Sequence, residues 1–243
     1  MTAIRIVDVE DAQGFGLIPP CAYPSFDHRS CDYWEDADRG SKAARSLTAR
    51  RTPAPQPTSA LMDNPFAPAS RGPAVNPFLR DDADTTDNPF LPRRSSAKPV
   101  LTPDAPRKMA LLTRGIGVFG TYAKVLLLDD VAAAYTQFGP LSAYPRALRL
   151  RELYPALPDS PLPAVITCVA TTREARDRGF AKMLVAAVCS DLGQRGFAAV
   201  EAYPDVGAAP DATSAATPEF WEAAGFQLAA PDERFPVYRR VLE

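Results

Sequence analysis

The chain has 243 residues, of which 46% are hydrophobic and 23% are charged, the composition of a soluble globular protein with a sizeable core. Lys and Arg number 27 against 29 Asp and Glu, and this balance argues against a dedicated binder of nucleic acid or of an anionic membrane surface. The opening MTAIRIVDVEDA lacks the regions of a secretory signal, and no run approaches the ~18 apolar residues of a membrane span, so we expect a cytoplasmic protein.

The N-terminal part predicts one strand, over residues 3–8, followed by a segment rich in aromatic residues and cysteine. Cys21, His28 and Cys31 raise the question of a zinc site, but they supply three ligands where structural zinc usually takes four. No metal is therefore expected. His28 is the single histidine, which disfavours Ser-His-Asp and Cys-His catalysis. The favoured alternative is an aromatic cap packed on the domain, made by Tyr23, Phe26, Tyr33 and Trp34.

Residues 41–106 form a proline-rich stretch that we predict to be disordered. Proline contributes 26 of the 243 residues, about twice its ordinary share of ~5%, and twelve of them fall between residues 50 and 106. Tyr and Trp are absent from that part and aliphatic residues are few. Such a stretch cannot bury enough apolar surface to offset the entropy lost on ordering.

The aromatic residues of this stretch end three Asn-Pro-Phe triplets, spaced twelve residues apart. An Asn-Pro pair favours a compact turn that presents the following Phe outward. Three such anchors on a flexible tether gain apparent affinity for a multivalent protein partner. The triplets resemble the short motifs that eukaryotic EH domains bind; the alternative is a proline-biased linker. They are Asn64, Pro65 and Phe66; Asn76, Pro77 and Phe78; and Asn88, Pro89 and Phe90.

From residue 107 onward the sequence predicts regular secondary structure. Asp129 and Asp130 indicate a hairpin turn between two strands, and Gly225 ends a short helix. Apolar residues recur at helical spacing in one long segment, and β-branched residues dominate a buried strand before it. The predicted helices cover 107–119, 148–157, 179–194 and 218–226, and the predicted strands cover 121–128, 131–139, 164–172, 198–204 and 235–242.

The segment from Arg176 to Ala181 lies between a predicted strand and the start of the long predicted helix. The first backbone N–H groups of a helix have no intrahelical partner and lie at the positive end of its dipole, so they favour a pyrophosphate. Gly179 allows close backbone approach, while Arg176 and Arg178 add positive charge. The segment is neither a Walker A loop nor a G-x-G-x-x-G turn, and the alternative is a merely basic helix start.

Two motifs here resemble those of the GNAT superfamily of N-acetyltransferases. Residues 169–181 (VATTREARDRGFA) are similar to the acyl-CoA signature Q/R-x-x-G-x-G/A that follows a buried strand. Residues 220–226 (FWEAAGF) are similar to the F-Y-E-x-x-G-F segment of the family. The resemblance covers about residues 107–243, and the early Cys31-Asp-Tyr-Trp-Glu run looks like a feature of some actinobacterial members.

The resemblance implies an α+β fold with a mixed, mostly antiparallel sheet, flanking helices and a splay between the two middle strands. It also implies acetyl-CoA as acyl donor, with its pantetheine along residues 164–171 and direct attack of an amine on the thioester. A backbone N–H after a bulge near Val169 and Ala170 would donate to the carbonyl. The implied acetyl-CoA contacts are Val169, Ala170, Arg176, Asp177, Arg178, Gly179, Phe180, Ala181 and Trp221.

Trp221 departs from the family, which often places there a tyrosine that protonates the leaving thiolate. We therefore expect Trp221 to pack beside the pantetheine or to close the pocket. Glu201, on the strand expected to splay from the cofactor strand, is the best-placed general base by sequence, although it could equally be a salt-bridged residue. Tyr203 is a weaker candidate for protonating the thiolate. Cys168 and Cys189 lie in apolar runs and are expected to be buried, inert thiols.

The strand count places the proline-rich stretch inside one domain. The sequence after residue 107 lacks a convincing first strand, which residues 3–8 can supply, so residues 1–40 and 107–243 would share a domain interrupted by residues 41–106. We predict an N-acetyltransferase that acts on an amine of a small molecule or a protein. The alternative is a weakly or non-catalytic acyl-CoA-binding protein that recruits partners through its Asn-Pro-Phe triplets.

Overall fold

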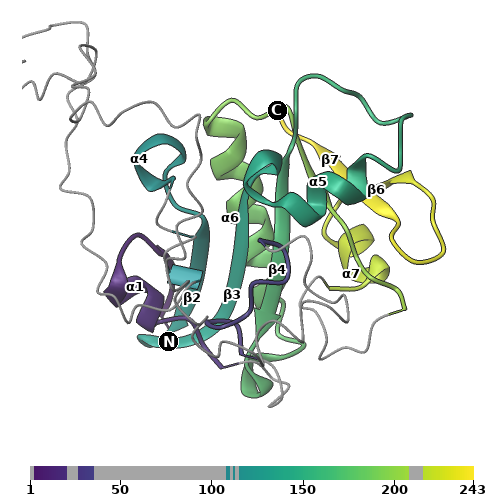
Figure 1. Ribbon diagram of the computed structural model, residues 1–243. Coiled ribbons are helices and arrows are strands. Elements are labelled where there is room, and N and C mark those ends of the chain that lie inside the picture. The colour runs from purple at the N-terminus through teal and green to yellow at the C-terminus, as the bar shows by residue number, and fades with distance from the viewer. Residues whose placement is uncertain (1–2, 21–26, 36–107, 110–111, 113–114, 208–215) are drawn as a thin grey trace, which may run out of the picture.

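The computed structural model describes residues 3–20, 27–35, 108–109, 112, 115–207 and 216–243. Among these residues, seven strands form one sheet with the order β1-β2-β3-β4-β5-β7-β6 (Figure 1). β4 and β5 run parallel, and every other neighbouring pair runs antiparallel. The strands are β1 (Ile4–Asp8), β2 (Ala123–Leu128), β3 (Val131–Pro140), β4 (Ala164–Thr171), β5 (Ala199–Ala202), β6 (Gln227–Ala230) and β7 (Val237–Val241).

Helices cover both faces of the sheet, so the predicted α+β class with a mixed, mostly antiparallel sheet is confirmed. The long helix α6 lies against β2, β3, β4 and β5, while α5 lies on the opposite face (Figure 1). Within the described segments, no helix combines the length and the apolarity needed to cross a membrane. The helices are α1 (Ala12–Gly16), α4 (Ile116–Phe119), α5 (Pro145–Arg151), α6 (Phe180–Gln194) and α7 (Pro218–Ala223), with 3₁₀ turns at Leu141–Ala143 and Arg173–Ala175.

The predicted hairpin forms at Asp129 and Asp130, which both adopt positive φ angles, 47° and 67°. Two left-handed residues are what a tight hairpin needs to match the twist of its strands. β1 pairs with β2 along its whole length, from Ile4 opposite Leu128 to Asp8 opposite Lys124, so residues 3–8 do supply the first strand. The domain boundaries stay predictions, since residues 36–107 lie outside the described part of the chain.

Two predicted helices differ from the structure. The helix predicted over 148–157 is wrong in its bounds, because α5 begins at Pro145 and ends at Arg151. Proline suits the first helical position, whereas Pro155 disfavours continuation of the helix. The helix predicted over 107–119 is interrupted by a turn at Gly115, where the ring of Tyr122 occupies the space that a side chain would need.

Buried side chains lie on both faces of the sheet. The first core cluster, on the face of α5 and residues 27–35, includes Trp34, Tyr135, Tyr144, Cys168 and Tyr203. The second core cluster, under α6 and α7, includes Val169, Val188, Leu192, Trp221 and Phe226. Burial of one large apolar side chain contributes about 1.5–3 kcal/mol. These two layers fix the strands between which the candidate site lies.

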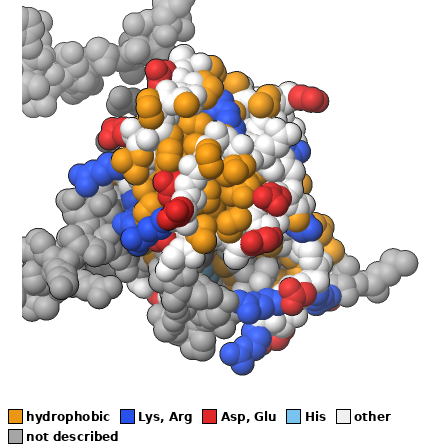
Figure 2. Space-filling model, turned by 90° about the vertical axis from the view of Figure 1, so that its right-hand side faces the viewer, with side chains coloured by type: hydrophobic (Ala, Val, Ile, Leu, Met, Phe, Trp, Pro, Cys, Tyr) orange, Lys and Arg blue, Asp and Glu red, His pale blue; other side chains and the backbone are white. Residues whose placement is uncertain are grey.

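Hydrophobic side chains also reach the surface on one side of the molecule. Figure 2 shows them gathered on the face that forms the right-hand side of Figure 1, where α5, β6 and β7 lie. Leu153, Leu162 and Leu228 are each more than half exposed. Apolar atoms make up much of the surface of any folded protein, so this face by itself indicates no ligand.

Candidate functional site

β4 and β5 separate after only two paired positions. Ala164 lies opposite Val200 and Val165 opposite Glu201, and no further pairing follows among the described residues. On its other edge β4 stays paired with β3, although the register shifts so that Thr167 forms a bulge. The bulge therefore lies two residues before the predicted position at Val169. Beyond Val165 the edge of β4 that faces β5 has no strand partner there, and its backbone groups can pair with an extended ligand.

β4 leads into the turn that the sequence predicts to bind phosphate. Asp177 and Gly179 adopt positive φ angles of 57° and 81°, and α6 begins directly afterwards at Phe180. Gly179 occupies the N-cap position of α6, where no side chain caps the first N–H groups of the helix. A Cβ atom built on Gly179 would meet nothing within 4 Å. Alternation of left-handed residues along a turn directs successive N–H groups toward a concave anion site. The end of α6 is thus open to a ligand.

The side chains of this turn divide between surface and core. Arg176, Asp177 and Arg178 are exposed, and the guanidinium of Arg178 lies 4.9 Å from the centre of the Phe180 ring. Phe180 is buried, and Ala181 is half-buried. Two exposed arginines therefore directly precede the start of α6, while Phe180 packs in a core cluster with Leu126 of β2.

Trp221, predicted to contact acetyl-CoA, is fully buried in the second core cluster. Its ring lies 4.9 Å from Phe226 and 5.2 Å from Phe220, both in edge-to-face geometry. Val169 belongs to the same cluster, and the helix α7 that carries Trp221 lies against β6 and β7. Its predicted contact with the cofactor stays a prediction.

Glu201, the predicted general base, is fully buried and surrounded by partners. Its Oε2 accepts hydrogen bonds from Tyr203 Oη at 2.5 Å and from Arg151 Nε at 3.1 Å, while Oε1 accepts one from Arg239 Nη1 at 2.5 Å. Burial raises the pKa of Tyr203 far above its ordinary value, and the neighbouring carboxylate raises it further. Tyr203 therefore stays protonated and donates to Glu201. The predicted catalytic roles of both residues remain predictions.

No pattern in the sequence predicts the arginines that hold Glu201. Arg151 ends α5 and Arg239 lies in β7, each about forty or fifty positions from Glu201 in the chain. No local spacing relates residues so far apart. Arg149 and Arg151 give the predicted helix over 148–157 a basic face, but this pattern does not indicate which carboxylate an arginine meets.

The aromatic cap prediction is confirmed for Tyr33 and Trp34, which pack on the first core cluster. Tyr23 and Phe26 lie outside the described residues, as does Cys21. His28 is buried with its Nδ1 3.6 Å from Cys168 Sγ, and the described residues contain no group of three side chains able to hold a metal ion. A further buried pair joins Glu35 to Lys108, with 3.1 Å between Oε1 and Nζ.

We expect His28 to make the stability depend on pH. Burial lowers its pKa from 6.5 to about 4, with a smaller contribution from the Lys108 charge. The unfolded chain thus binds a proton before the folded one, and stability is lost as the pH falls from 6.5 toward about 4. That shift corresponds to a loss of about 3 kcal/mol. Urea unfolding from pH 7.5 to 4 should show this loss, relative to a His28→Asn variant that lacks it. Parallel curves would contradict the prediction.

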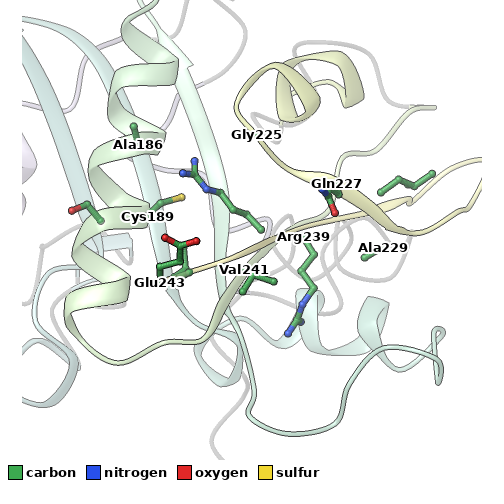
Figure 3. Close-up of a pocket in the computed structure, with 12 residues that line it drawn as sticks. Ala186, Cys189, Gly225, Gln227, Ala229, Arg239, Val241 and Glu243 are labelled. Carbon is green, nitrogen blue, oxygen red and sulfur yellow. The ribbon is translucent and has the colours of Figure 1, made fainter.

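A cavity of about 660 Å³ lies between the C-terminal half of α6 and strands β6 and β7 (Figure 3). None of the residues predicted to bind acetyl-CoA lines it. Among them, residues 176–181 lie at the other end of α6. Burial raises the pKa of Cys189, on its wall, to about 11, as expected of an inert thiol. Its lining includes Ala186, Cys189, Gln227, Arg239, Val241 and Glu243.

No protein-family model matches the chain, and no curated protein matches it. Among solved structures it is similar to a Desulfovibrio desulfuricans protein assigned to the GNAT family of acetyltransferases, with 18% identity over 59% of this chain and 85% of that chain, and a TM-score of 0.39. The PaiA N-acetyltransferase from Thermoplasma acidophilum, in complex with coenzyme A, shows 9% identity over 49% and 59%, with a TM-score of 0.34. The ribosomal-protein-S18-alanine N-acetyltransferase from Escherichia coli shows 16% identity over 49% and 66%, with a TM-score of 0.30.

Proposed function

We propose that the protein is an acyl-CoA-dependent N-acyltransferase that moves an acetyl group from acetyl-CoA to an amine. The observation that carries this proposal is the course of β4. The strand separates from β5 beyond Val165 and leads through two left-handed residues into the open N-terminus of α6. The two sequence motifs that resemble the GNAT superfamily, at 169–181 and 220–226, support it.

The groups along this course suit the chemistry of acetyl-CoA. Its pantetheine carries amides, which can pair with the backbone of β4 at Val169 and Ala170 as a neighbouring strand would. Its pyrophosphate is an anion that the first N–H groups of α6, together with Arg176 and Arg178, would attract. The space in front of Gly179 leaves room for that approach.

Acetyl-CoA, when bound, supplies the thioester that the acceptor amine attacks. The separation of β4 from β5 would hold donor and acceptor in line, which replaces a bimolecular encounter by an oriented one. A backbone N–H beside the Thr167 bulge would donate to the carbonyl oxygen as negative charge develops there. Glu201 as proton acceptor and Tyr203 as proton donor to the thiolate are part of the proposal.

The proposed donor site can be tested with the two glycines that flank α6. Gly179 and Gly196 adopt almost the same φ, 81° and 84°, and a side chain at either position would meet nothing within 4 Å. Valine therefore strains the backbone similarly at both. We expect Gly179→Val to weaken acetyl-CoA binding by at least about tenfold, because it blocks the approach to the α6 N-terminus. Isothermal titration calorimetry measures this affinity. Gly196→Val is the control, and its affinity for acetyl-CoA should stay within about twofold of that of the native chain.

Equal affinities for the two valine variants would contradict the proposed donor site. Catalysis needs a second readout, namely release of free CoA thiol from acetyl-CoA when amines are added. Binding without amine-dependent thiol release would favour the alternative of a non-catalytic acyl-CoA-binding protein. Recruitment of a partner through the Asn-Pro-Phe triplets is a separate proposal that rests on the sequence, since the triplets lie outside the described residues.

A further inference from the structure

A carboxylate lies at the end where β5 diverges from β4. Asp205 follows Tyr203 by two residues, and its side chain is only 6% exposed. Among the described residues, its partners are Tyr33 Oη, 3.4 Å from Oδ2, and Arg234 Nε, 3.4 Å from Oδ1. Both distances lie at the long, weak limit of hydrogen bonding. As far as the described residues show, long contacts hold this buried carboxylate, which retains capacity to bind a cation.

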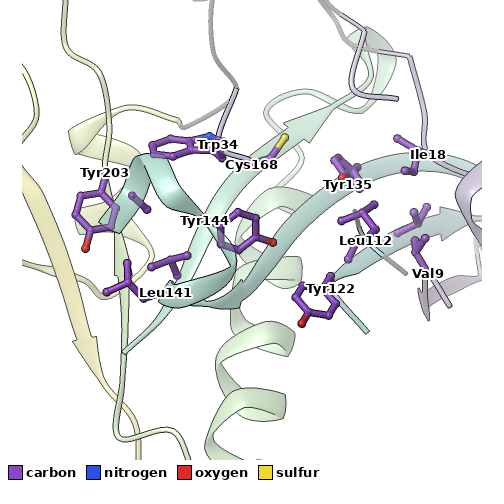
Figure 4. Packing of buried hydrophobic residues seen from close by; sticks show 14 of the residues in the cluster. Val9, Ile18, Trp34, Leu112, Tyr122, Tyr135, Leu141, Tyr144, Cys168 and Tyr203 are labelled. Atoms are coloured by element: carbon purple, nitrogen blue, oxygen red, sulfur yellow. The ribbon is translucent and has the colours of Figure 1, made fainter. Parts of the chain in front are cut away.

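Aromatic rings surround this carboxylate. Tyr33 meets Trp34 edge-on at 5.2 Å between ring centres, and Trp34 lies 6.5 Å from Tyr203. Figure 4 shows Trp34 and Tyr203, from segments far apart in the sequence, on one side of the first core cluster. The guanidinium of Arg146 lies 3.8 Å from the centre of the Tyr33 ring. A cation thus already occupies one ring face of this cluster, as the electrostatics of aromatic rings favour.

The position of Asp205 and its neighbouring rings relative to β4 supports a binding site as much as their chemistry does. Trp34, Tyr203 and Cys168 belong to the first core cluster, whereas α6 packs on the opposite face of the sheet. Cys168 directly follows the bulge of β4. A group held by Asp205 would therefore come to the separated strands from the face opposite α6, while the donor lies along β4.

We propose that Asp205, with Tyr33 and Trp34, binds the acceptor as an aliphatic ammonium ion. The inference rests on the proposed N-acyl transfer, for which it names the acceptor class. A carboxylate beside aromatic rings stabilises a positive charge with an aliphatic chain, and it offers little to a neutral alcohol of the same shape. Arg234 is largely exposed, so its side chain can move away from Asp205 when the ammonium binds.

Tyr33 has a supporting part in this site. Burial raises the pKa of its phenol, Arg146 opposes that shift, and Asp205 adds to it. The phenol consequently remains protonated and donates its hydrogen bond to the carboxylate. At 3.4 Å this hydrogen bond is weak, so the carboxylate can still turn toward a bound cation.

The test uses the fluorescence of Trp34, because the chain contains only two tryptophans. In a Trp221→Phe background Trp34 is the single reporter. Titration with n-butylammonium should change its emission to saturation, and n-butanol at equal concentration should not. Asp205→Asn, added to this background, should weaken the n-butylammonium response by at least about tenfold, whereas Asp159→Asn at an exposed position should leave it within about twofold.

An equal response to n-butanol, an unchanged affinity in Asp205→Asn, or no response of Trp34 would each overturn the proposal. Calorimetric titration of the native chain and of Asp205→Asn with acetyl-CoA, both with Trp221 intact, separates this site from the donor site. A chain that binds n-butylammonium through Asp205 and fails to bind acetyl-CoA would keep the ammonium site and reject the proposed function. Loss of acetyl-CoA binding in Asp205→Asn together with the native n-butylammonium affinity would reject the ammonium site.

Discussion

Replacement of Glu201 by alanine is expected to lower the free energy of unfolding by about 3–5 kcal/mol, the cost of leaving buried partners without their counter-charge. Arg151 and Arg239 both donate to this carboxylate, and their side chains are themselves largely buried. Urea denaturation followed by circular dichroism gives the measurement. Glu152→Ala, at an exposed position, is the control and should change the unfolding free energy by less than about 0.5 kcal/mol.

A loss below about 1 kcal/mol in Glu201→Ala would show that the two arginines find other partners. Glu201→Gln addresses the predicted catalytic role, because it keeps the shape of the side chain and removes the charge. An unchanged pH profile of kcat/KM in this variant, with altered stability, would leave Glu201 as a structural counter-ion and reject it as the base.

Trp221→Ala is expected to destabilise the fold by about 3–5 kcal/mol, through the lost burial of the indole and the cavity left behind. The ring is fully buried and contacts Phe220 and Phe226. Trp221→Phe keeps most of the volume and should cost less than half as much. Thermal and urea unfolding of both variants provide the comparison.

The same pair of variants tests the contact with acetyl-CoA that the sequence predicts for Trp221. If the indole serves only as core, Trp221→Phe should bind acetyl-CoA within about twofold of the native affinity. A tenfold loss of affinity with nearly native stability would instead assign the ring to the cofactor site.

Local patterns in the sequence predicted the elements whose residues carry their own signals. Asp129 and Asp130 favour the left-handed angles of a hairpin, and the apolar spacing of residues 180–194 follows the period of a helix. β6 was not predicted, because Gln227–Ala230 is short and mostly exposed. Its extended conformation depends on its pairing with β7. α1 is only five residues long, and its Asp11 cap is a weak signal by itself.

The candidate site likewise contains residues that local sequence patterns predict and residues that they do not. The turn from Arg176 to Gly179 could be predicted because its residues are contiguous and the chemistry of a helix N-terminus is general. The surroundings of Glu201 could not, since Arg151, Tyr203 and Arg239 come together only through the sheet and α5. Asp205 has no motif around it, and its meeting with Tyr33 depends on how residues 27–35 cross the sheet.

The buried pair of Glu35 and Lys108 has a consequence for how this chain can change over evolution. The two residues lie directly before and after positions 36–107, so an ion pair links the described residues on either side of those positions. Lys108 Nζ also donates a hydrogen bond to the carbonyl of Cys31, which is a second contact with the segment before position 36. The entropic cost of a connection between fixed ends grows only with the logarithm of its length, about 0.6 kcal/mol for each doubling. For the insertion that the sequence predicts between these two residues, we therefore expect changes in length to cost little stability as long as the Glu35–Lys108 pair is kept.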